Sequence, residues 1–474
     1  MHVARSLVTL AALLAACSPP SLTPDSAFAD ECGPIKVGAA QPNTLLDSIG
    51  FPATLKKSCS PYYFTDPVAI SSELTIEAGV TLIGPMGGKR SRLTITPGGL
   101  LLATGTAEEP ITFTSTYAAS GGVLGGQWSG ILFLESRPGS HLEHVIIEYA
   151  GGRYMRVVGD DEFGAYEFPV DGSLLNDSTP NLEVVDVIIR RSNGYAIAAT
   201  TSDPFDTDKQ SIYAAMDRVS LADNQRGLWL PVNQGGALGP DLCFVARAVD
   251  GTCPADPAPA GHFVELHLDS NFGRTPESVN HDAVWKPYGA PFQLDTVNVV
   301  GGALLEVLDG AELRMTQVGG ISVGLNEPGA IRMVGTAARG ITITSATANP
   351  TPAQHWNGIS IWDMADERTH LEGVDISYGG RRAPILTEAP ALVMIYNSNP
   401  TLVGNHVHHS VGAGIHWNCQ SDPGGLEEPP LPSTNTSDDA TIACAALVGS
   451  GIAENYGCAC PMGGCMNRCP PTGL

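Results

Sequence analysis

Basic residues, aromatic residues and long hydrophobic runs are all scarce in this sequence. It has 25 Lys plus Arg against 49 Asp plus Glu, a formal net charge of -24, and aromatic side chains make up only 6% of its 474 residues. A surface this acidic repels phosphate backbones, which excludes nucleic-acid binding as a function. No segment beyond residue 30 holds 18 consecutive apolar residues, so no membrane-spanning helix is predicted there.

Motifs of several enzyme classes are also missing. The sequence contains no H-E-x-x-H and no phosphate-loop motif, and the N-T-D, G-H-G and R-I-K motifs of galacturonases do not occur. Glycine and proline, in contrast, are abundant at 54 and 36 residues, together well above the ordinary share of about 12%. The frequent turns exclude a helical bundle, while a hydrophobic content of 43% suffices for a large core.

The first residues have the anatomy of a signal peptide. Arg5 precedes an apolar run from Leu7 to Ala16, and small residues lead up to Cys17. The Leu-Ala-Ala-Cys ending resembles the lipobox of bacterial lipoproteins, which implies removal of residues 1–16 and lipidation of Cys17. A plain signal peptide cut nearby is the alternative. We expect residues 17–58 to form a tether and N-terminal cap, and lipid alone to hold the exported protein at the bacterial cell envelope, on the outer membrane or cell surface.

Cysteine usage fits an exported chain. Of the 11 cysteines, ten remain when Cys17 is set aside, an even number that favours disulfides. Cys32 with Cys59, and Cys243 with Cys253, are local pairs. The other six cysteines are Cys419, Cys444, Cys458, Cys460, Cys465 and Cys469. We expect three disulfides among them, and their connectivity is open. A zinc knuckle formed by the last four is disfavoured, because their spacing lacks the paired C-x2-C of zinc sites.

Internal repetition is the strongest structural signal. Gly105-Thr-Ala107, Trp128-Ser-Gly-Ile131 and His141-Leu-Glu143 recur in the same order about 230 residues later. The second copies are Gly335-Thr-Ala337, Trp356-Asn-Gly-Ile359 and His370-Leu-Glu372. We therefore divide the chain into two modules, residues 59–270 and 271–419, followed by a linker at 420–441 and a Cys-rich tail at 442–474.

Apolar residues alternate with polar ones over short runs throughout both modules. Examples are Ile111/Phe113, Ile131/Phe133, Ile341/Ile343 and Ile359/Ile361. Such runs have strand periodicity and lie roughly 15 to 25 residues apart without a helical pattern between them. The spacing favours a coil of parallel strands whose apolar side chains stack, turn on turn, into one core.

The order of these motifs resembles a known family. E-A-G-V-T-L from Glu77, G-T-A-x-x-P-I-T-F-T-S from Gly105, W-S-G-I from Trp128 and L-E-H-V-I-I-E-Y-A-G-G from Leu142 are similar to right-handed parallel β-helix lipoproteins of the pectin-lyase-like superfamily. The resemblance covers most of residues 70–420 and implies an all-β solenoid. It leaves the activity open, because the superfamily includes polysaccharide lyases, hydrolases, adhesins and other surface proteins.

Two interruptions of the repeat, residues 153–173 and 231–262, are expected as loops on the flank of the coil. Six acidic residues in the first module could supply oxygen ligands for Ca²⁺: Asp160, Asp161, Glu162, Asp203, Asp206 and Asp208. They do not match the D-x-[DN]-x-[DN]-G calcium loop, so a solvated acidic surface is the preferred interpretation. No other cofactor is expected.

A dense histidine patch follows in the second module. Aligning Pro400 with Pro180 places Val407 at the core position of Val187, which puts His406 and His408 on the outer face of one strand. This geometry could present two imidazoles to Zn²⁺. No third ligand is apparent, and His409 adds only a neighbouring ring, so exposed histidines are the preferred interpretation.

The aromatic residues favour packing roles. Trp128 and Trp356 recur in the structural frame, as do Tyr149 and Tyr378, which indicates packing anchors more than sugar-binding rings. Five further aromatic and basic side chains are scattered along the sequence with no pattern that brings them together: Arg153, Tyr154, Arg156, Arg226 and Trp229.

These features favour a non-enzymatic surface lipoprotein: a β-helix scaffold that binds a polysaccharide, a matrix component or a protein partner, with the membrane contacted through its anchor alone. The alternative is a polysaccharide lyase or glycoside hydrolase whose catalytic residues the sequence does not identify. A cleft lined by three or more carboxylates on adjacent turns would favour the enzyme.

The anchor gives a first prediction. We expect Cys17→Ser to move the protein from the membrane fraction to the soluble fraction, because the acyl chains are its only hold on the bilayer. Fractionation followed by immunoblotting measures this. Unchanged membrane association in the variant would contradict the lipoprotein assignment.

Overall fold

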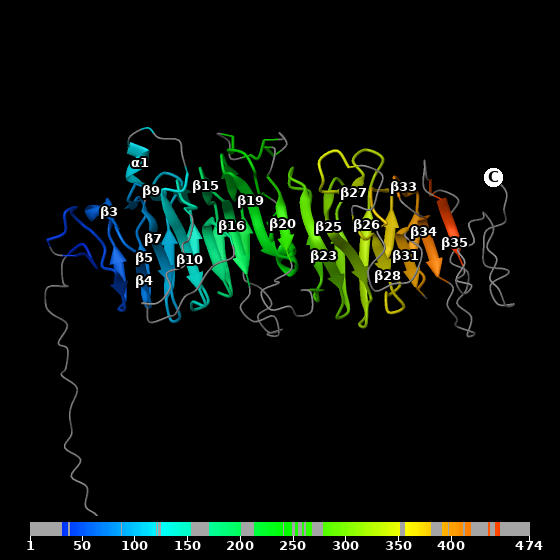
Figure 1. Ribbon diagram of the computed structural model, residues 1–474. Helices are drawn as coiled ribbons and strands as arrows, with labels where there is room; N and C mark the ends of the chain where they lie inside the picture. The colour runs from blue at the N-terminus through cyan, green and yellow to red at the C-terminus, as the bar shows by residue number, and fades with distance from the viewer. Residues whose placement is uncertain are drawn as a thin grey trace, which may run out of the picture.

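The chain forms an elongated stack of short strands that runs from its N-terminal to its C-terminal region (Figure 1). The computed structural model describes residues 31–36, 38–86, 88–119, 121, 125–152, 170–200, 213–239, 241–248, 252–254, 258–259, 262–267, 278–350, 356–380, 391–396, 398–410, 413–418, 435–436 and 441–445. The expected signal peptide, residues 1–16, and Cys17 lie outside these residues. Within them, no helix is long and apolar enough to cross a membrane.

Each turn of the first half contributes one strand to each of three parallel sheets. The first sheet receives β1 (Ser48–Ile49), β4 (Val68–Ile70), β7 (Gly88–Ile95), β10 (Trp128–Leu134), β13 (Gly172–Asp177), β16 (Tyr195–Thr200) and β19 (Arg226–Pro231). The second receives β2 (Ala53–Leu55), β5 (Glu73–Ile76), β8 (Leu100–Thr104), β11 (His141–Glu143), β14 (Leu182–Val185) and β17 (Tyr213–Asp217). The third receives β3 (Tyr62–Tyr63), β6 (Thr81–Gly84), β9 (Ile111–Ser115), β12 (Val145–Glu148), β15 (Ile188–Arg190) and β18 (Ser220–Ala222).

The second half continues the coil with three faces of its own. One face is a separate sheet of β22 (Ala283–Trp285), β24 (Ala303–Val307), β26 (Gly329–Val334), β29 (His370–Glu372) and β32 (Thr401–Val403). The next face holds β27 (Ile341–Ser345), β30 (Val374–Ser377) and β33 (His406–His408). The last holds β28 (Ile359–Ile361), β31 (Ala391–Tyr396), β34 (Ala413–Asn418) and β35 (Thr441–Ala445). This is a parallel β-helix, as the alternating pattern predicts.

Two long strands join the halves. β23 (Phe292–Val299) and β25 (Glu312–Val323) each pair along both of their ends, so that the last two faces merge into one 18-stranded sheet. β20 (Val264–His267) pairs with β19 on one side and with the first residues of β23 on the other. β21 (Ser278–Val279) pairs with the far end of β23. The first sheet of the first half therefore runs on into the β27–β30–β33 face of the second.

One continuous core fills the coil. Ile111, Phe113, Ile131 and Phe133 are each 0% exposed, and so are their repeats Ile341, Ile343, Ile359 and Ile361. Because side chains along a strand alternate between its two faces, burial of these residues places the residues between them on the outside of the coil. The predicted stacking of apolar residues turn on turn is confirmed.

Repeated tryptophans anchor the core. Trp128 and Trp356 are fully buried, and their indole nitrogens donate hydrogen bonds to the carbonyl oxygens of Glu148, at 3.0 Å, and Ser377, at 2.9 Å. The preference for packing over sugar binding is thus confirmed. Gly130 follows Trp128 with φ +108°, and a Cβ there would lie 2.5 Å from the Ser173 carbonyl oxygen, which explains the glycine in the motif.

The segment from Pro231 to His262 is more than the flank loop expected. It begins with a 3-10 helix, η3 (Val232–Ala237), and then Leu238 pairs with Met216 and Cys243 with Ser220, in parallel. Leu242 and Phe244 enter the main core. The prediction of a flank loop was wrong for these residues. They form a turn of the coil without regular strands, and such a turn shows no alternating apolar pattern in the sequence.

Two disulfides lie where the local pairs predict them. Cys32 bonds to Cys59, at the end of the 3-10 helix η2 (Lys57–Cys59), and Cys243 bonds to Cys253. Of the six cysteines from Cys419 onward, Cys444 belongs to β35, and five lie outside the described residues: Cys419, Cys458, Cys460, Cys465 and Cys469. The pairing within the tail stays a prediction.

The core gives a second prediction. Phe113→Ala should lower the free energy of unfolding by about 3 to 5 kcal/mol, because it removes a ring from a fully buried position between stacked turns. The neighbouring Thr112→Ala, on the outer side of the same strand, serves as control and should change it by less than about 1 kcal/mol. Urea unfolding measures both; similar losses would contradict the assignment of Phe113 to the core.

Candidate binding face on the long sheet

A row of outward-facing side chains crosses the long sheet from the first half into the second. Each member is set in register with the next, or hydrogen-bonded to it, on the neighbouring strand. We call this set the outer row: Leu132, Leu175, Ala198, Trp229, Glu265, Gln293, Arg314, Thr344, Ser377 and His408. From Trp229 to His408 the row makes six strand-to-strand steps, a span of about 29 Å.

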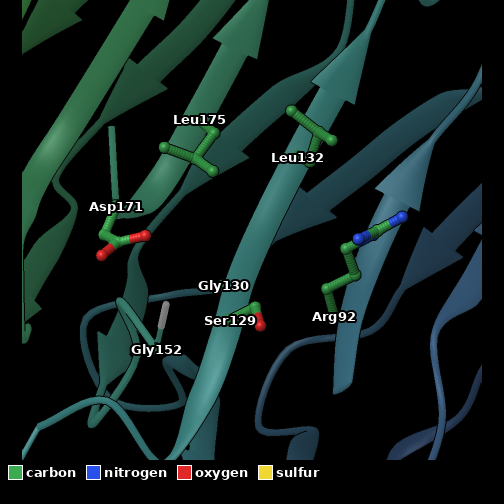
Figure 2. Close-up of a pocket in the computed structure, with 8 residues that line it drawn as sticks. Arg92, Ser129, Gly130, Leu132, Gly152, Asp171 and Leu175 are labelled. Atoms are coloured by element: carbon green, nitrogen blue, oxygen red, sulfur yellow. The ribbon is translucent and has the colours of Figure 1, made fainter. Parts of the chain in front are cut away.

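The beginning of the row borders a shallow hollow. Figure 2 shows Leu132 on β10 and Leu175 on β13 between Arg92, on β7, and Asp171, which precedes β13. Ser129 and glycines at 130, 152 and 172 complete its lining. The hollow thus has an apolar floor with a cation on one side and a carboxylate on the other.

Aromatic rings gather beside this floor. Leu132, Leu175, Tyr195 and Ala198 form an apolar cluster distinct from the core, against which Trp229 packs. The Trp229 ring stacks on His267 with 3.3 Å between centroids and 13° between planes, and it lies 6.4 Å from Tyr195. Outside the core, the sheet therefore carries an aromatic cluster in which Tyr195 and His267 are buried, at 4% and 7% exposed, and Trp229 is half-buried.

Charged groups tie this surface together. The Tyr195 hydroxyl donates a hydrogen bond to Glu265, and Arg226 donates one of 2.9 Å to the Tyr195 oxygen while its guanidinium lies 5.1 Å above the ring. Burial raises the pKa of Glu265; the Tyr195 bond and the Arg226 charge oppose this shift, and the nearby Asp295 charge adds to it. Burial, followed by Glu265, raises the pKa of Tyr195 as well. Glu265 consequently holds a proton to higher pH than an exposed glutamate.

Polar groups continue along the row. Arg314 bonds to Glu312 at 2.7 Å and lies 5.6 Å above the ring of Phe263. Asp295 accepts a 2.5 Å hydrogen bond from Thr316 on the next strand. Beyond the rings around Trp229, the face therefore carries groups that donate and accept hydrogen bonds, among them the carboxylates of Glu265, Asp295 and Glu312.

Imidazoles meet a carboxylate at the far end. His406 and His408 face outward from β33 around the buried Val407, as predicted. Asp375 on β30 is directly paired with His406, and its oxygens lie 3.2 Å from His406 Nδ1 and 2.9 Å from His408 Nε2. Asp375 is a third potential ligand that was not apparent from the sequence, because it lies 31 residues away in sequence and one strand away in space.

A second mixed cluster lies on a corner of the first half. Glu143, His144 and Asp186 offer ligand atoms within 4.8 Å of one another. Here, however, Arg218 donates two hydrogen bonds of 2.8 and 2.7 Å to the Asp186 carboxylate. Arg218 also lowers the pKa of Asp186. The guanidinium already neutralises this carboxylate.

The sequence identified some of these residues but did not predict that they lie together. Arg226 and Trp229, which looked scattered, converge on one face. Arg153, Tyr154 and Arg156 lie outside the described residues, as do all six candidate calcium ligands, Asp160, Asp161, Glu162, Asp203, Asp206 and Asp208. The sequence analysis did not identify Tyr195, Glu265 and His267. A signal for the outer position of Trp229 was present, because it lies between the buried Leu228 and Leu230. The strand register then places Glu265 beside Trp229.

Strand β25 ends in a short match to an enzyme motif. Gly320-Ile-Ser-Val-Gly324 matches the G-x-S-x-G pattern of hydrolase nucleophiles. Ser322 lies inside strand β25, where its hydroxyl accepts a 2.9 Å hydrogen bond from Trp362 Nε1. A nucleophile elbow requires a sharp turn from strand to helix, so the match has no catalytic geometry.

Comparison with protein-family models, with curated proteins and with solved structures found no match for this chain. The resemblance to pectin-lyase-like lipoproteins therefore stays a prediction from the sequence motifs.

The buried carboxyl gives a third prediction. Below the unfolded pKa of about 4.5, both states hold the Glu265 proton. As the pH rises toward the higher folded pKa, the unfolded state releases this proton first, so the wild type loses stability relative to the non-titrating Glu265→Gln. Urea unfolding of both proteins between about pH 4 and pH 8 should show a difference that grows in favour of the variant. A difference that is constant or moves the other way would contradict a raised pKa.

Proposed function

We propose that the protein is an exported scaffold that binds a polysaccharide along the outer row, on the aromatic face around Trp229. The observation that carries this proposal is the convergence of Tyr195, Trp229 and His267 on the outer side of a sheet whose inner side already contains the core. The lipid anchor at Cys17 would keep this scaffold at the cell envelope.

Chemistry of the face supports a sugar ligand. The half-buried Trp229 ring can cover the apolar face of a pyranose ring, with Tyr195 and His267 buried behind it, and the flanking Arg226, Glu265 and Arg314 can exchange hydrogen bonds with hydroxyl groups. The face extends along the coil as a row, which suits a linear chain more than a compact molecule. A formal charge of -24 favours a neutral polysaccharide over an acidic one.

A hydrolase is the second candidate, favoured by one observation. Glycoside hydrolases use a pair of carboxyl groups. One of them has a raised pKa, stays protonated near neutral pH and acts as general acid. Glu265 has such a pKa, and Asp295 is close enough for its charge to contribute to it. The described part of the face offers a third carboxylate, Glu312, but Arg314 is already ion-paired with it at 2.7 Å, so binding is the preferred function.

Binding is tested with Trp229→Ala. Neutral glucans and galactans and polygalacturonate are titrated against the full chain. The variant should bind the neutral chain about fivefold more weakly, since a stacked ring contributes about 1 kcal/mol. Phe51→Ala is the control, because Phe51 is 39% exposed and lies before β2, away from the outer row. Equal affinities of wild type and Trp229→Ala for every sugar would refute the proposed face.

The same incubations separate binding from hydrolysis. New reducing ends that appear with the wild type and disappear with Glu265→Gln would establish the hydrolase. Binding of the polysaccharide without new reducing ends supports the binding scaffold.

A further inference from the structure

We propose that Asp375, His406 and His408 form a Zn²⁺ site on the outer side of β30 and β33. This proposal does not depend on the polysaccharide face. It rests on three side chains that the strand register brings together from two turns of the coil.

Distances in this cluster fit zinc. Tetrahedral Zn²⁺ with bonds of about 2.0 to 2.1 Å places neighbouring ligand atoms about 3.3 Å apart. The Asp375 oxygens lie 3.2 Å from His406 Nδ1 and 2.9 Å from His408 Nε2. All three ligand atoms lie within 4.8 Å of one another, so an ion can enter with small side-chain rotations.

The negative charge of the Asp375 carboxylate also favours a bound cation. In the described part of the chain, the hydrogen bonds and ion pairs of Asp375 are made with His406 and His408, without an arginine or a lysine. Asp186 in the otherwise similar corner cluster is paired with Arg218. Zn²⁺ would supply to Asp375 the positive charge that Arg218 supplies to Asp186.

Neighbouring rings hold the imidazoles in place. His406 and His408 stack with 4.6 Å between centroids, and the second nitrogen of His408 lies 2.5 Å from His409 Nδ1. His409 in turn stacks on Tyr378 at 4.5 Å. Such outer contacts orient metal-binding imidazoles.

Two nitrogen ligands select the metal and leave it accessible. Imidazole suits zinc, whereas Ca²⁺ takes six to eight oxygen ligands. The His406, His408 and Asp375 side chains are 34%, 17% and 44% exposed, so the ion is reached from solvent. With three protein ligands, Zn²⁺ keeps a fourth position for water or for a donor atom of a bound molecule.

The experiment uses the full chain, stripped of metal with a chelator and treated with iodoacetamide so that free thiols no longer bind zinc. Calorimetric titration with Zn²⁺ should find one ion per chain at this site. Asp375→Asn and His408→Ala should each weaken its binding by about tenfold or more. His144→Ala, which removes the imidazole of the corner cluster, should keep the wild-type affinity, and excess Ca²⁺ should not displace the ion.

Absence of zinc binding in the wild type would overturn the proposal. Unchanged affinity in both Asp375→Asn and His408→Ala, an equal loss in His144→Ala, or displacement by Ca²⁺ would do the same. Asp375→Asn nearly preserves the shape of the side chain, so it decides the outcome if His408→Ala disturbs the fold, which circular dichroism reports.

Discussion

Side-chain register between successive turns is the constraint on which this structure depends. A parallel strand that slipped by one residue would turn its whole apolar set outward, and the core would lose its stacked columns. Full burial of Phe113, Phe133 and Ile343 shows how strictly the register is kept. The same constraint orders the outside, because residues between the buried ones must also stand in columns. The outer row is therefore a consequence of core packing.

Corners keep the register from drifting. In the first half, the residue between the second and third sheets is His144, Asp186 or Arg218 in successive turns, with φ of 49°, 52° and 51°. Each adopts the left-handed conformation that L-residues rarely take, so these three turns pass from the second sheet to the third with the same backbone conformation. Stacked corners also bring their side chains together, which is how Arg218 meets Asp186. Tyr149 and Tyr378, with φ of 61° and 57°, occupy equivalent corners in the two halves.

The sequence predicts the repeating part of this architecture well, because alternation and motif order are local signals. Phe113, Ile131 and Val407 are all buried as expected. Partners on the outer face are harder, since they depend on which residues of two turns are opposite each other. Turn lengths vary, and Trp229 and Glu265 face each other across 36 residues of sequence. Asp375 reads as an ordinary polar residue between Val374 and Ile376 until β30 and β33 are set in register.

The two candidate sites share a physical origin that bears on how they could work together. A coil has no deep interior to enclose a ligand, so its binding groups must be spread over the outside, and affinity then comes from several modest contacts in line. Trp229 and His408 belong to the same row, about 29 Å apart by strand spacing. A chain held by the aromatic face at one end would run toward Asp375 and His406 at the other. A zinc ion there would offer its open position to an oxygen of that chain, which adds a directional contact at the end of the row opposite Trp229.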